Sequence, residues 1–291
     1  MHEKEAKTIL STQNGMNLYC GCSYGCVLCD VRVTGGRMKH PADDIEIRVN
    51  APELLEVALR RKRSKCMIMT GSMGDPYQPV EEERGLMRRC LEVIDRYGFG
   101  LVIQTRSDLV LRDLDLLKSI NRKSRCIVQM KFSAADAALS AKIEPGARPP
   151  EARAEALGKL RDAGIPAIAW FTPVLPFIND TEENIRALMS AAVEAGVYGV
   201  RGPAREIQLR QSEKEAFYRT LDERFPGMAG RYAAVFEDPL ELPLPRGEEL
   251  TELVHGIAVN YHIEDDASRL FTYLHAFVDR EAGEQMSLFD L

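Results

Sequence analysis

Short β-rich apolar runs alternate with amphipathic helical patterns along most of this chain. The six runs fall at residues 16–19, 66–69, 101–105, 126–132, 166–171 and 197–200. Helices are expected between them, at about 52–63, 82–97, 109–119, 150–163 and 181–195. This alternation is typical of βα units around a parallel sheet. With right-handed crossovers, the pattern predicts an α/β fold, a partial (β/α)6 barrel of the TIM type.

The alternation ends near residue 210. A helical stretch at 212–224, a proline-rich connection PLELPLP at 239–245 and a helix near 248–259 follow. We therefore expect a barrel domain over 1–210, a small and mostly helical C-terminal extension over 211–264, and a tail over 265–291. One helix start is suggested by Asp180 with Glu183, which form a capping-box pattern.

The composition argues against a membrane-spanning or secreted protein. The chain has no apolar run of about 18 residues, and its first ten residues are charged where a signal peptide is apolar. A cytoplasmic protein without a membrane partner is expected. The net charge of −6 gives no overall case for nucleic-acid binding. A local basic run covers residues 60–65, and Arg84, Arg88 and Arg89 could extend it.

Four of the seven cysteines lie within residues 20–29. The segment CSYGCVLC, residues 22–29, has CxxxCxxC spacing directly after the first expected strand. Iron–sulfur clusters usually take four cysteines, so a set of three leaves one iron open for another ligand. S-adenosylmethionine (SAM) suits that position, since its amine and carboxylate can chelate iron. The alternatives are a structural zinc site with Cys20 as fourth ligand, and chance clustering.

Five stretches together resemble the radical SAM superfamily, in the branch related to spore photoproduct lyase. They are NLYCGCSYGCVLCD at 17–30, TGSMGDPYQPVE at 70–81, QTRSDLVLRDLDLL at 104–117, IEPGARPPEAR at 143–153 and TPVLPFINDTEEN at 172–184. The resemblance implies a partial (β/α)6 barrel with a 4Fe-4S cluster and SAM as cofactors. It also implies reductive cleavage of SAM to a 5'-deoxyadenosyl radical, with the cofactor carrying the chemistry.

The resemblance assigns roles to particular positions. It implies that the cluster is bound by Cys22, Cys26 and Cys29. It implies that SAM is bound by Leu28, Gly71, Ser72, Met73, Asp75, Arg106 and Ser133. Each SAM position also has a structural interpretation: the glycine shapes a turn, Arg106 pairs with Asp108, Ser133 caps a helix, and Leu28 belongs to the core.

Two positions depart from the pattern of spore photoproduct lyase. Ser72 stands at or near the place of the cysteine that returns a hydrogen atom to the product radical in that enzyme. A serine cannot act as this hydrogen-atom donor, because its O–H bond is too strong. Leu28 stands where a tyrosine is expected. The resemblance therefore implies SAM cleavage but not the lyase reaction itself. Glu144 and Arg153, in the IEPG stretch and the helix after it, are interpreted either as an ion pair or as substrate contacts.

The last residues suggest a partner. Gln285, Ser287, Leu288 and Phe289 resemble the peptide by which bacterial repair proteins dock on the β sliding clamp, although they could equally pack on the chain's own core. Our first hypothesis is a radical SAM enzyme acting on DNA, with reduced flavodoxin or ferredoxin as electron donor. The second replaces DNA with a peptide, RNA or small molecule. The third is a zinc-stabilised interaction module without enzymatic activity.

Overall fold

A six-stranded sheet forms the centre of the fold, with strand order β2-β5-β6-β7-β8-β9. The computed structural model describes residues 1–29, 40–41 and 43–280. All neighbouring strands in this sheet are parallel, and within the described residues the sheet stays open. The strands are β2 (Gly15–Met16), β5 (Met67–Thr70), β6 (Gly100–Thr105), β7 (Cys126–Phe132), β8 (Ala167–Phe171) and β9 (Gly199–Arg201). The predicted partial (β/α)6 barrel is confirmed.

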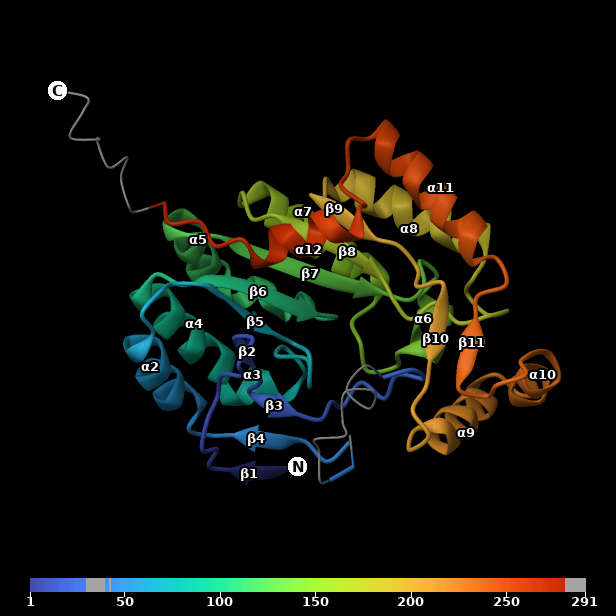
Figure 1. Cartoon of the computed structure of the whole chain (residues 1–291), viewed down its shortest axis with the longest axis horizontal. Helices are drawn as coiled ribbons and strands as arrows, with labels where there is room; N and C mark the ends of the chain where they lie inside the picture. Colours follow the sequence, from blue (N-terminus) through green and yellow to red (C-terminus); the bar gives the residue numbers. More distant parts are fainter. Residues whose placement is uncertain (30–39, 42, 281–291) are drawn as a thin grey trace.

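Helices between the strands cover one face of this sheet (Figure 1). They are α2 (Ala51–Arg61), α4 (Leu86–Tyr97), α5 (Leu114–Lys123), α7 (Pro150–Asp162) and α8 (Glu182–Ala195). Their apolar sides pack on alternate strand residues such as Leu101, Val128 and Ala169, which are fully or almost fully buried. We call this helix-covered side the outer face and the other side the inner face.

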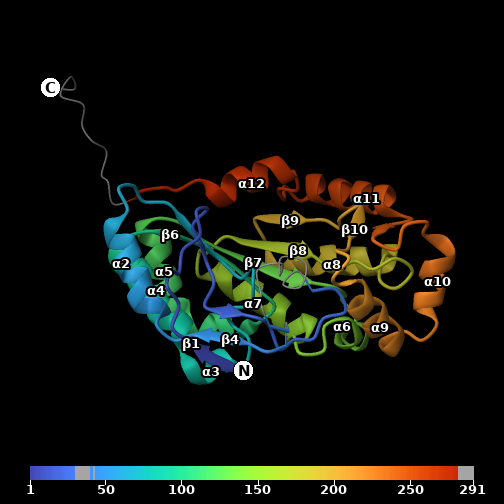
Figure 2. The ribbon, with the colours of Figure 1, turned by 60° about the horizontal axis from the view of Figure 1, so that its bottom comes forward.

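The amino-terminal half of the inner face is covered by a helix near the end of the described chain. Leu270 and Leu274 of α12 (Ala267–His275) pack on Val102, Ile127 and Ile168. Figure 2 shows α12 along the top of the molecule in that view. The segment expected to be a tail over 265–291 therefore begins with a packed helix. The clamp-like peptide at 285–289 lies outside the described residues.

Several expected helices differ in detail from the structure. The helix expected at 82–97 is divided into α3 (Val80–Arg84) and α4, because Gly85 between them is left-handed, with φ 58°. The helix expected at 109–119 begins as a 3-10 turn, η2 (Asp108–Asp113), before α5. The capping-box interpretation was wrong: Thr181, not Asp180, accepts the hydrogen bond from the Asn184 N–H that caps α8. Helix α6 (Ala137–Ile143) was not expected.

Two groups of smaller elements lie outside the central sheet. Near the N-terminus, β1 (His2–Lys4), β4 (Glu46–Arg48) and β3 (Tyr19–Cys20) form a three-stranded sheet. The mostly helical extension contains α9 (Lys214–Arg224), α10 (Met228–Val235), β11 (Glu241–Pro243), which pairs antiparallel with β10 (Glu206–Gln208) just before the extension, and α11 (Gly247–Asn260). Its buried Phe217 and Tyr232 share a cluster with Val27 of the cysteine segment. Among the helices described, none is long and apolar enough to cross a bilayer.

Candidate cofactor site

Cys22, Cys26 and Cys29 line one narrow cavity at the carboxyl ends of the central strands. The structure thus brings together the three thiols that the sequence singled out. The same cavity is lined by Tyr24, Leu28, Gly71, Asp75, Gln104, Thr105, Arg106 and Lys131. These residues come from the loops after β3 and β5 and from the ends of β6 and β7. This edge is where ligand sites gather in parallel α/β folds, because the loops after the strands converge there.

Hydrogen bonds from three other segments fix the backbone of the cysteine loop. Gln78 accepts from the Ser23 N–H at 3.1 Å and donates to the Gly21 carbonyl at 3.2 Å. The Val27 N–H donates to the Ile143 carbonyl at 2.9 Å. Arg224 of the extension donates to the Gly25 carbonyl at 2.7 Å. The three cysteines are therefore presented on an anchored loop.

The chemistry of the cavity favours a soft metal centre. Burial raises the pKa of the Cys22 thiol, and the electrostatic influence of Asp75 and of the neighbouring Cys26 and Cys29 raises it further. A thiolate in such a place needs a positive partner, and a coordinated metal supplies one because a coordinating thiol is deprotonated. Three sulfur ligands on one anchored loop therefore fit an iron–sulfur cluster with one iron open to a further ligand.

The loop after β5 passes close to two other backbones. Gly71 has φ 101°, and a Cβ built on it would lie 2.2 Å from the Gln104 carbonyl oxygen. A Cβ on Gly74 would lie 2.5 Å from the Gly21 carbonyl oxygen of the cysteine loop. Neither position has room for a side chain. Glycine is required here because the main chain itself forms this wall of the cavity.

Replacing Gly71 with alanine is expected to destabilise the fold by more than replacing Gly85. Both residues have positive φ, which costs an alanine about 1–2 kcal/mol. Gly85 has no atom within 4 Å of a built Cβ, whereas Gly71 would also clash with the backbone of Gln104. Urea unfolding of the two variants measures the difference. Equal destabilisation of the two variants would show that the backbone near Gly71 and Gln104 shifts to accept the added Cβ at no cost.

The Asp75 carboxylate braces this loop against β6. It accepts hydrogen bonds from the Tyr77 N–H at 2.9 Å, the Thr105 hydroxyl at 2.7 Å and the Arg106 N–H at 2.6 Å. Burial raises the pKa of Asp75, although these three donors act in the opposite direction. Asp75 therefore holds the cavity wall together from its edge.

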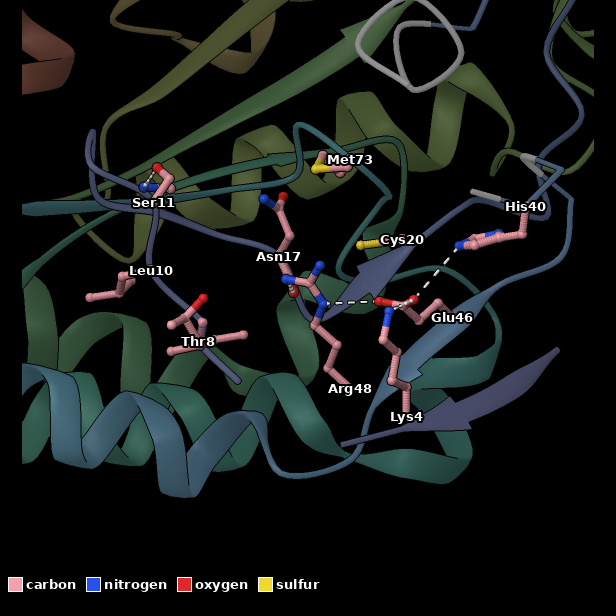
Figure 3. A pocket seen from close by; sticks show the side chains of 12 residues that line it. Lys4, Thr8, Leu10, Ser11, Asn17, Cys20, His40, Glu46, Arg48 and Met73 are labelled. Atoms are coloured by element: carbon pink, nitrogen blue, oxygen red, sulfur yellow. Dashed lines mark hydrogen bonds and ion pairs between the residues drawn. The ribbon is translucent and has the colours of Figure 1, made fainter. Parts of the chain in front are cut away.

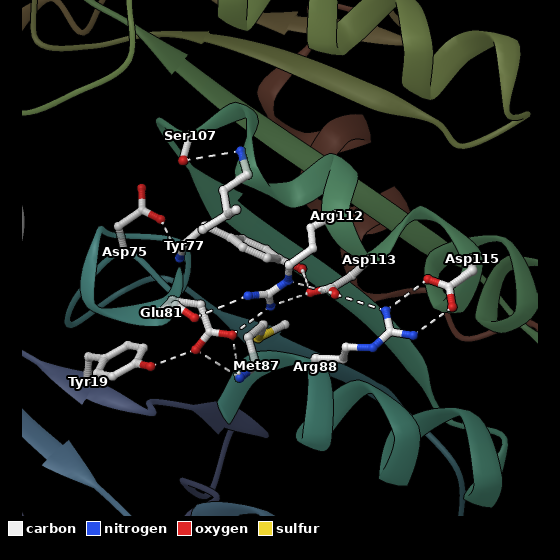
Figure 4. Close-up of polar contacts among 11 residues, drawn as sticks. Tyr19, Asp75, Tyr77, Glu81, Met87, Arg88, Ser107, Arg112, Asp113 and Asp115 are labelled. Atoms are coloured by element: carbon white, nitrogen blue, oxygen red, sulfur yellow. Dashed lines mark hydrogen bonds and ion pairs between the residues drawn. The ribbon is translucent and has the colours of Figure 1, made fainter. Parts of the chain in front are cut away.

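A buried polar network supports the same loop from behind (Figure 4). The Glu81 carboxylate accepts from the Tyr19 hydroxyl at 2.6 Å and from Arg112 at 2.7 Å. The Tyr77 hydroxyl donates to Asp113 at 3.1 Å. The loop is thus held through side chains of α3 and η2. Such fully connected networks make a site rigid.

Arg106 is held by a buried carboxylate. Its Nε donates to Glu144 at 2.8 Å, and the other Glu144 oxygen accepts from Arg153 at 2.6 Å. Burial acts to raise the pKa of Glu144, but Arg153 and Arg106 outweigh it and the pKa is lowered. The ion-pair interpretation of Glu144 and Arg153 is confirmed. The alternative pairing of Arg106 with Asp108 is wrong, because Asp108 pairs with Arg148.

Three of the expected SAM residues lie apart from the cysteine cavity. Ser72 and Met73 line neighbouring cavities; the Ser72 hydroxyl donates to Asn17 at 3.1 Å, and the Met73 carbonyl accepts from the Gly21 N–H. Ser133 is fully buried, and its hydroxyl has no hydrogen-bond partner among the described residues. Ser133 does not cap a helix, since Asp136 caps α6.

Cys20 belongs to a different cavity (Figure 3). It lies beside Glu46, Arg48 and His40, and it does not line the cavity of the other three cysteines. The zinc site with Cys20 as fourth ligand therefore loses its geometric support. Glu46, which with His40 and His2 could form a small ligand group, already pairs with Lys4 and Arg48. We assign no metal there.

The extension of the basic surface is not supported. Arg84 pairs with Glu3, Arg88 with Asp113 and Asp115, and Arg89 with Glu53. These carboxylates offset much of the positive charge that the sequence suggested.

Sequence reasoning missed several residues of the cavity wall, above all Gln104, Thr105 and Lys131. A signal was present in the strand CIVQMKF, residues 126–132, where polar Gln129 and Lys131 alternate with apolar side chains. In a strand buried on both faces, polar residues on one face near the carboxyl end indicate a site.

An open parallel sheet with a CxxxCxxC loop at its carboxyl edge defines a class of cluster-binding partial barrels. Residues 16–189 match the family model described as the radical SAM superfamily, and the chain belongs to this superfamily. It is a radical SAM enzyme, and its cofactors are a 4Fe-4S cluster and SAM. Like other members, it needs a reductant.

The chain is similar to several uncharacterized proteins and to enzymes of known structure. An uncharacterized protein of Mycobacterium tuberculosis is 28% identical over 257 residues, covering 86% of this chain and 75% of that protein. One of Methanocaldococcus jannaschii is 32% identical over 169 residues, covering 57% and 62%. Spore photoproduct lyase complexed with dinucleoside spore photoproduct superimposes with a TM-score of 0.61 and 14% identity, covering 89% and 78%. That likeness shows the fold.

Proposed function

We propose that this radical SAM enzyme acts on DNA, as a repair or base-modifying enzyme. The observation that carries its chemistry is the convergence of Cys22, Cys26 and Cys29 in one cavity beside Arg106 and Lys131. When bound there, the cluster supplies the electron that breaks the sulfonium C–S bond of SAM and releases a 5'-deoxyadenosyl radical. The chain's own residues bind, orient and enclose these groups.

The roles of the cavity residues follow from their positions. Cys22, Cys26 and Cys29 hold the cluster. The Gly71 backbone approaches the SAM amine, and Arg106, oriented by Glu144, attracts the SAM carboxylate. Leu28 provides an apolar contact for adenine. Asp75 positions the loop that carries Gly71. All of these assignments stay predictions, as do the contacts of Ser72, Met73 and Ser133 with SAM.

DNA as the substrate is supported by the matched sequence stretches and by the fold likeness to spore photoproduct lyase, whose structure holds a dinucleoside spore photoproduct. Ser72 and Leu28 still argue against the same reaction, because this chain lacks the cysteine and tyrosine of the pattern. A base in duplex DNA would have to leave the stack to reach the cavity, at a cost of a few kcal/mol. Damaged or single-stranded DNA would therefore react more readily.

The substrate assignment is tested with the anaerobically reconstituted enzyme, SAM and dithionite. Ultraviolet-irradiated, untreated and single-stranded DNA are incubated separately, and the nucleosides are then analysed by mass spectrometry. We expect altered nucleosides that depend on SAM in at least one DNA sample. SAM cleavage without any altered nucleoside would contradict DNA as the substrate and favour a peptide, RNA or small molecule.

Two partners are proposed from the sequence. Reduced flavodoxin or ferredoxin would supply the electron. The peptide at 285–289 would recruit the enzyme to the β sliding clamp, and its only support is the resemblance of the sequence. Deletion of residues 284–291 should abolish clamp binding without changing SAM cleavage, and clamp binding by the shortened chain would remove this partner.

A further inference from the structure

Polar and aromatic side chains occupy the part of the inner face that α12 leaves uncovered. Residues two apart in a strand lie on the same face. Ile127 and Ile168 pack against α12, so Gln129 and Lys131 of β7 and Trp170 of β8 also belong to the inner face. The inner face thus changes from apolar at its amino end to polar at its carboxyl end, beside the cysteine cavity.

Three of these residues form a row across neighbouring strands. Lys131, Trp170 and Arg201 are register partners in β7, β8 and β9. The Lys131 ammonium lies 4.5 Å and the Arg201 guanidinium carbon 4.0 Å from the centre of the indole ring. Cation–π attraction therefore holds two positive charges against one aromatic ring. Lys131 is only 4% exposed, so its charge lies largely out of water.

Trp170 and Arg201 of this row line a second cavity, which shares Leu28 with the cysteine cavity. This cavity of about 280 Å³ is lined by Trp170, Arg201, Pro173, Ile207 and Leu28, among others, and its lining includes the acidic residue Glu206. Leu28 also lines the cysteine cavity, as does Lys131. A ligand in the larger cavity would therefore lie next to the cysteine cavity, in which we propose that SAM is cleaved.

A second and independent observation on this face is an amide side chain whose hydrogen bonds are unsatisfied in the described part of the chain. Gln129 is fully buried, and neither of its amide atoms has a hydrogen-bond partner among the described residues. Its register partner is Gln104, which lines the cysteine cavity. Buried amides are normally satisfied by protein, water or ligand atoms. The inner face thus offers an amide, two cations and an indole together.

We infer that Trp170 and Arg201, assisted by Lys131, bind one nucleotide unit of the DNA substrate. This inference rests on the proposed function. Arg201, whose guanidinium carbon lies 4.0 Å from the indole centre, would donate hydrogen bonds to a phosphate. Trp170 and the apolar residues Pro173 and Ile207 contact the unstacked base. Proteins that hold single-stranded nucleic acid combine cationic and aromatic contacts in this way.

The test uses the reconstituted holoenzyme and a fluorescently labelled oligothymidylate. Trp170 is the only tryptophan in the chain, so its emission reports on this site alone. We expect the oligothymidylate to change this emission in a saturable manner. Arg201→Gln should weaken binding about tenfold, as measured by fluorescence anisotropy. It should also reduce the slope of log affinity against log salt concentration by about one. Arg201→Lys should keep the slope because it keeps the charge.

A matched control separates this site from general charge effects. Arg186 of α8 is exposed and pairs with Glu182, so Arg186→Gln makes the same change of charge away from the inner face. We expect it to bind as the unmodified enzyme does. Unchanged affinity and salt slope in Arg201→Gln, or oligothymidylate binding without any change in Trp170 emission, would overturn the inference.

The binding test and the reaction test can give opposite results, so each hypothesis can be refuted without the other. Binding through Arg201 without altered nucleosides would refute the proposed reaction and keep the nucleotide site. Altered nucleosides produced equally by Arg201→Gln and by the unmodified enzyme would keep the reaction and refute the site. Thymidine and thymidylate, compared as competitors, distinguish base binding from phosphate binding, and the inference requires thymidylate to compete more strongly.

Discussion

A Cys26→Ala variant is expected to lose its iron and sulfide and all cleavage of SAM. Cys26 is 6% exposed and shares one cavity with Cys22 and Cys29. With two thiolates remaining, one iron of the cluster lacks its ligand. No other described cysteine lines this cavity, so none can replace that ligand. Loss of a residue that merely supports a metal ligand costs about 10–100-fold in affinity, so loss of the ligand itself should exceed that. Iron and sulfide analysis of anaerobically purified protein measures the effect.

Cys66→Ala provides the matched control for this prediction. Cys66 is half-buried just before β5 and does not line the cysteine cavity. Its replacement should leave the iron and sulfide content unchanged, at about four iron atoms per chain. Equal iron and sulfide in Cys26→Ala and Cys66→Ala would contradict the assignment of the ligands. Zinc without iron in the unmodified protein would favour the interaction module.

Arg153→Met is expected to cause a large loss of stability. Arg153 is completely buried and donates to Glu144 at 2.6 Å, to Ser140 at 3.0 Å and to the Lys131 carbonyl at 2.6 Å. Removing one partner of a buried ion pair costs about 3–5 kcal/mol, and Glu144 would keep only Arg106 as a charged partner. Urea unfolding measures this loss.

Arg186→Met serves as the control, because its ion pair with Glu182 is exposed and spaced by four residues in α8. Such a pair contributes about 0.3–0.5 kcal/mol. If Arg153→Met lost no more stability than Arg186→Met, the buried pair would not support the fold.

The same pair predicts a dependence of stability on pH. The folded pKa of Glu144 is lowered, so its contribution to stability is complete above the ordinary glutamate pKa of about 4.3. The contribution is then lost as the pH falls through the lowered folded value. Unfolding free energies below about pH 4.3 should therefore fall less steeply in Glu144→Gln than in the unmodified enzyme.

The sequence predicted the central strands well for a physical reason. Residues 126–132 were expected as a strand and form β7 with the same bounds. Both faces of this central parallel strand are buried, and its first three residues and Met130 and Phe132 are apolar, so the strand was easy to recognise. The helix expected at 82–97 was predicted without a break at Gly85. The left-handed conformation of Gly85 divides that helix into two.

Other features depend on contacts that no local pattern contains. Helix α12 is short, and its role is set by packing on strands about 100 to 200 residues earlier. The row of Lys131, Trp170 and Arg201 arises from the register of three strands. The spacing of Cys22, Cys26 and Cys29 was readable because these residues lie on one loop, whereas the pairing of Arg106 with Glu144 joins distant segments.

Reductive cleavage of SAM tests the central claim most directly. The protein is reconstituted anaerobically with iron and sulfide, reduced with dithionite and incubated with SAM, and 5'-deoxyadenosine is quantified. We predict 5'-deoxyadenosine from the unmodified chain and from Cys66→Ala, and none from Cys26→Ala. Well-folded, iron-loaded protein that produces no 5'-deoxyadenosine, or a Cys26→Ala variant that produces as much as the unmodified chain, would contradict the account.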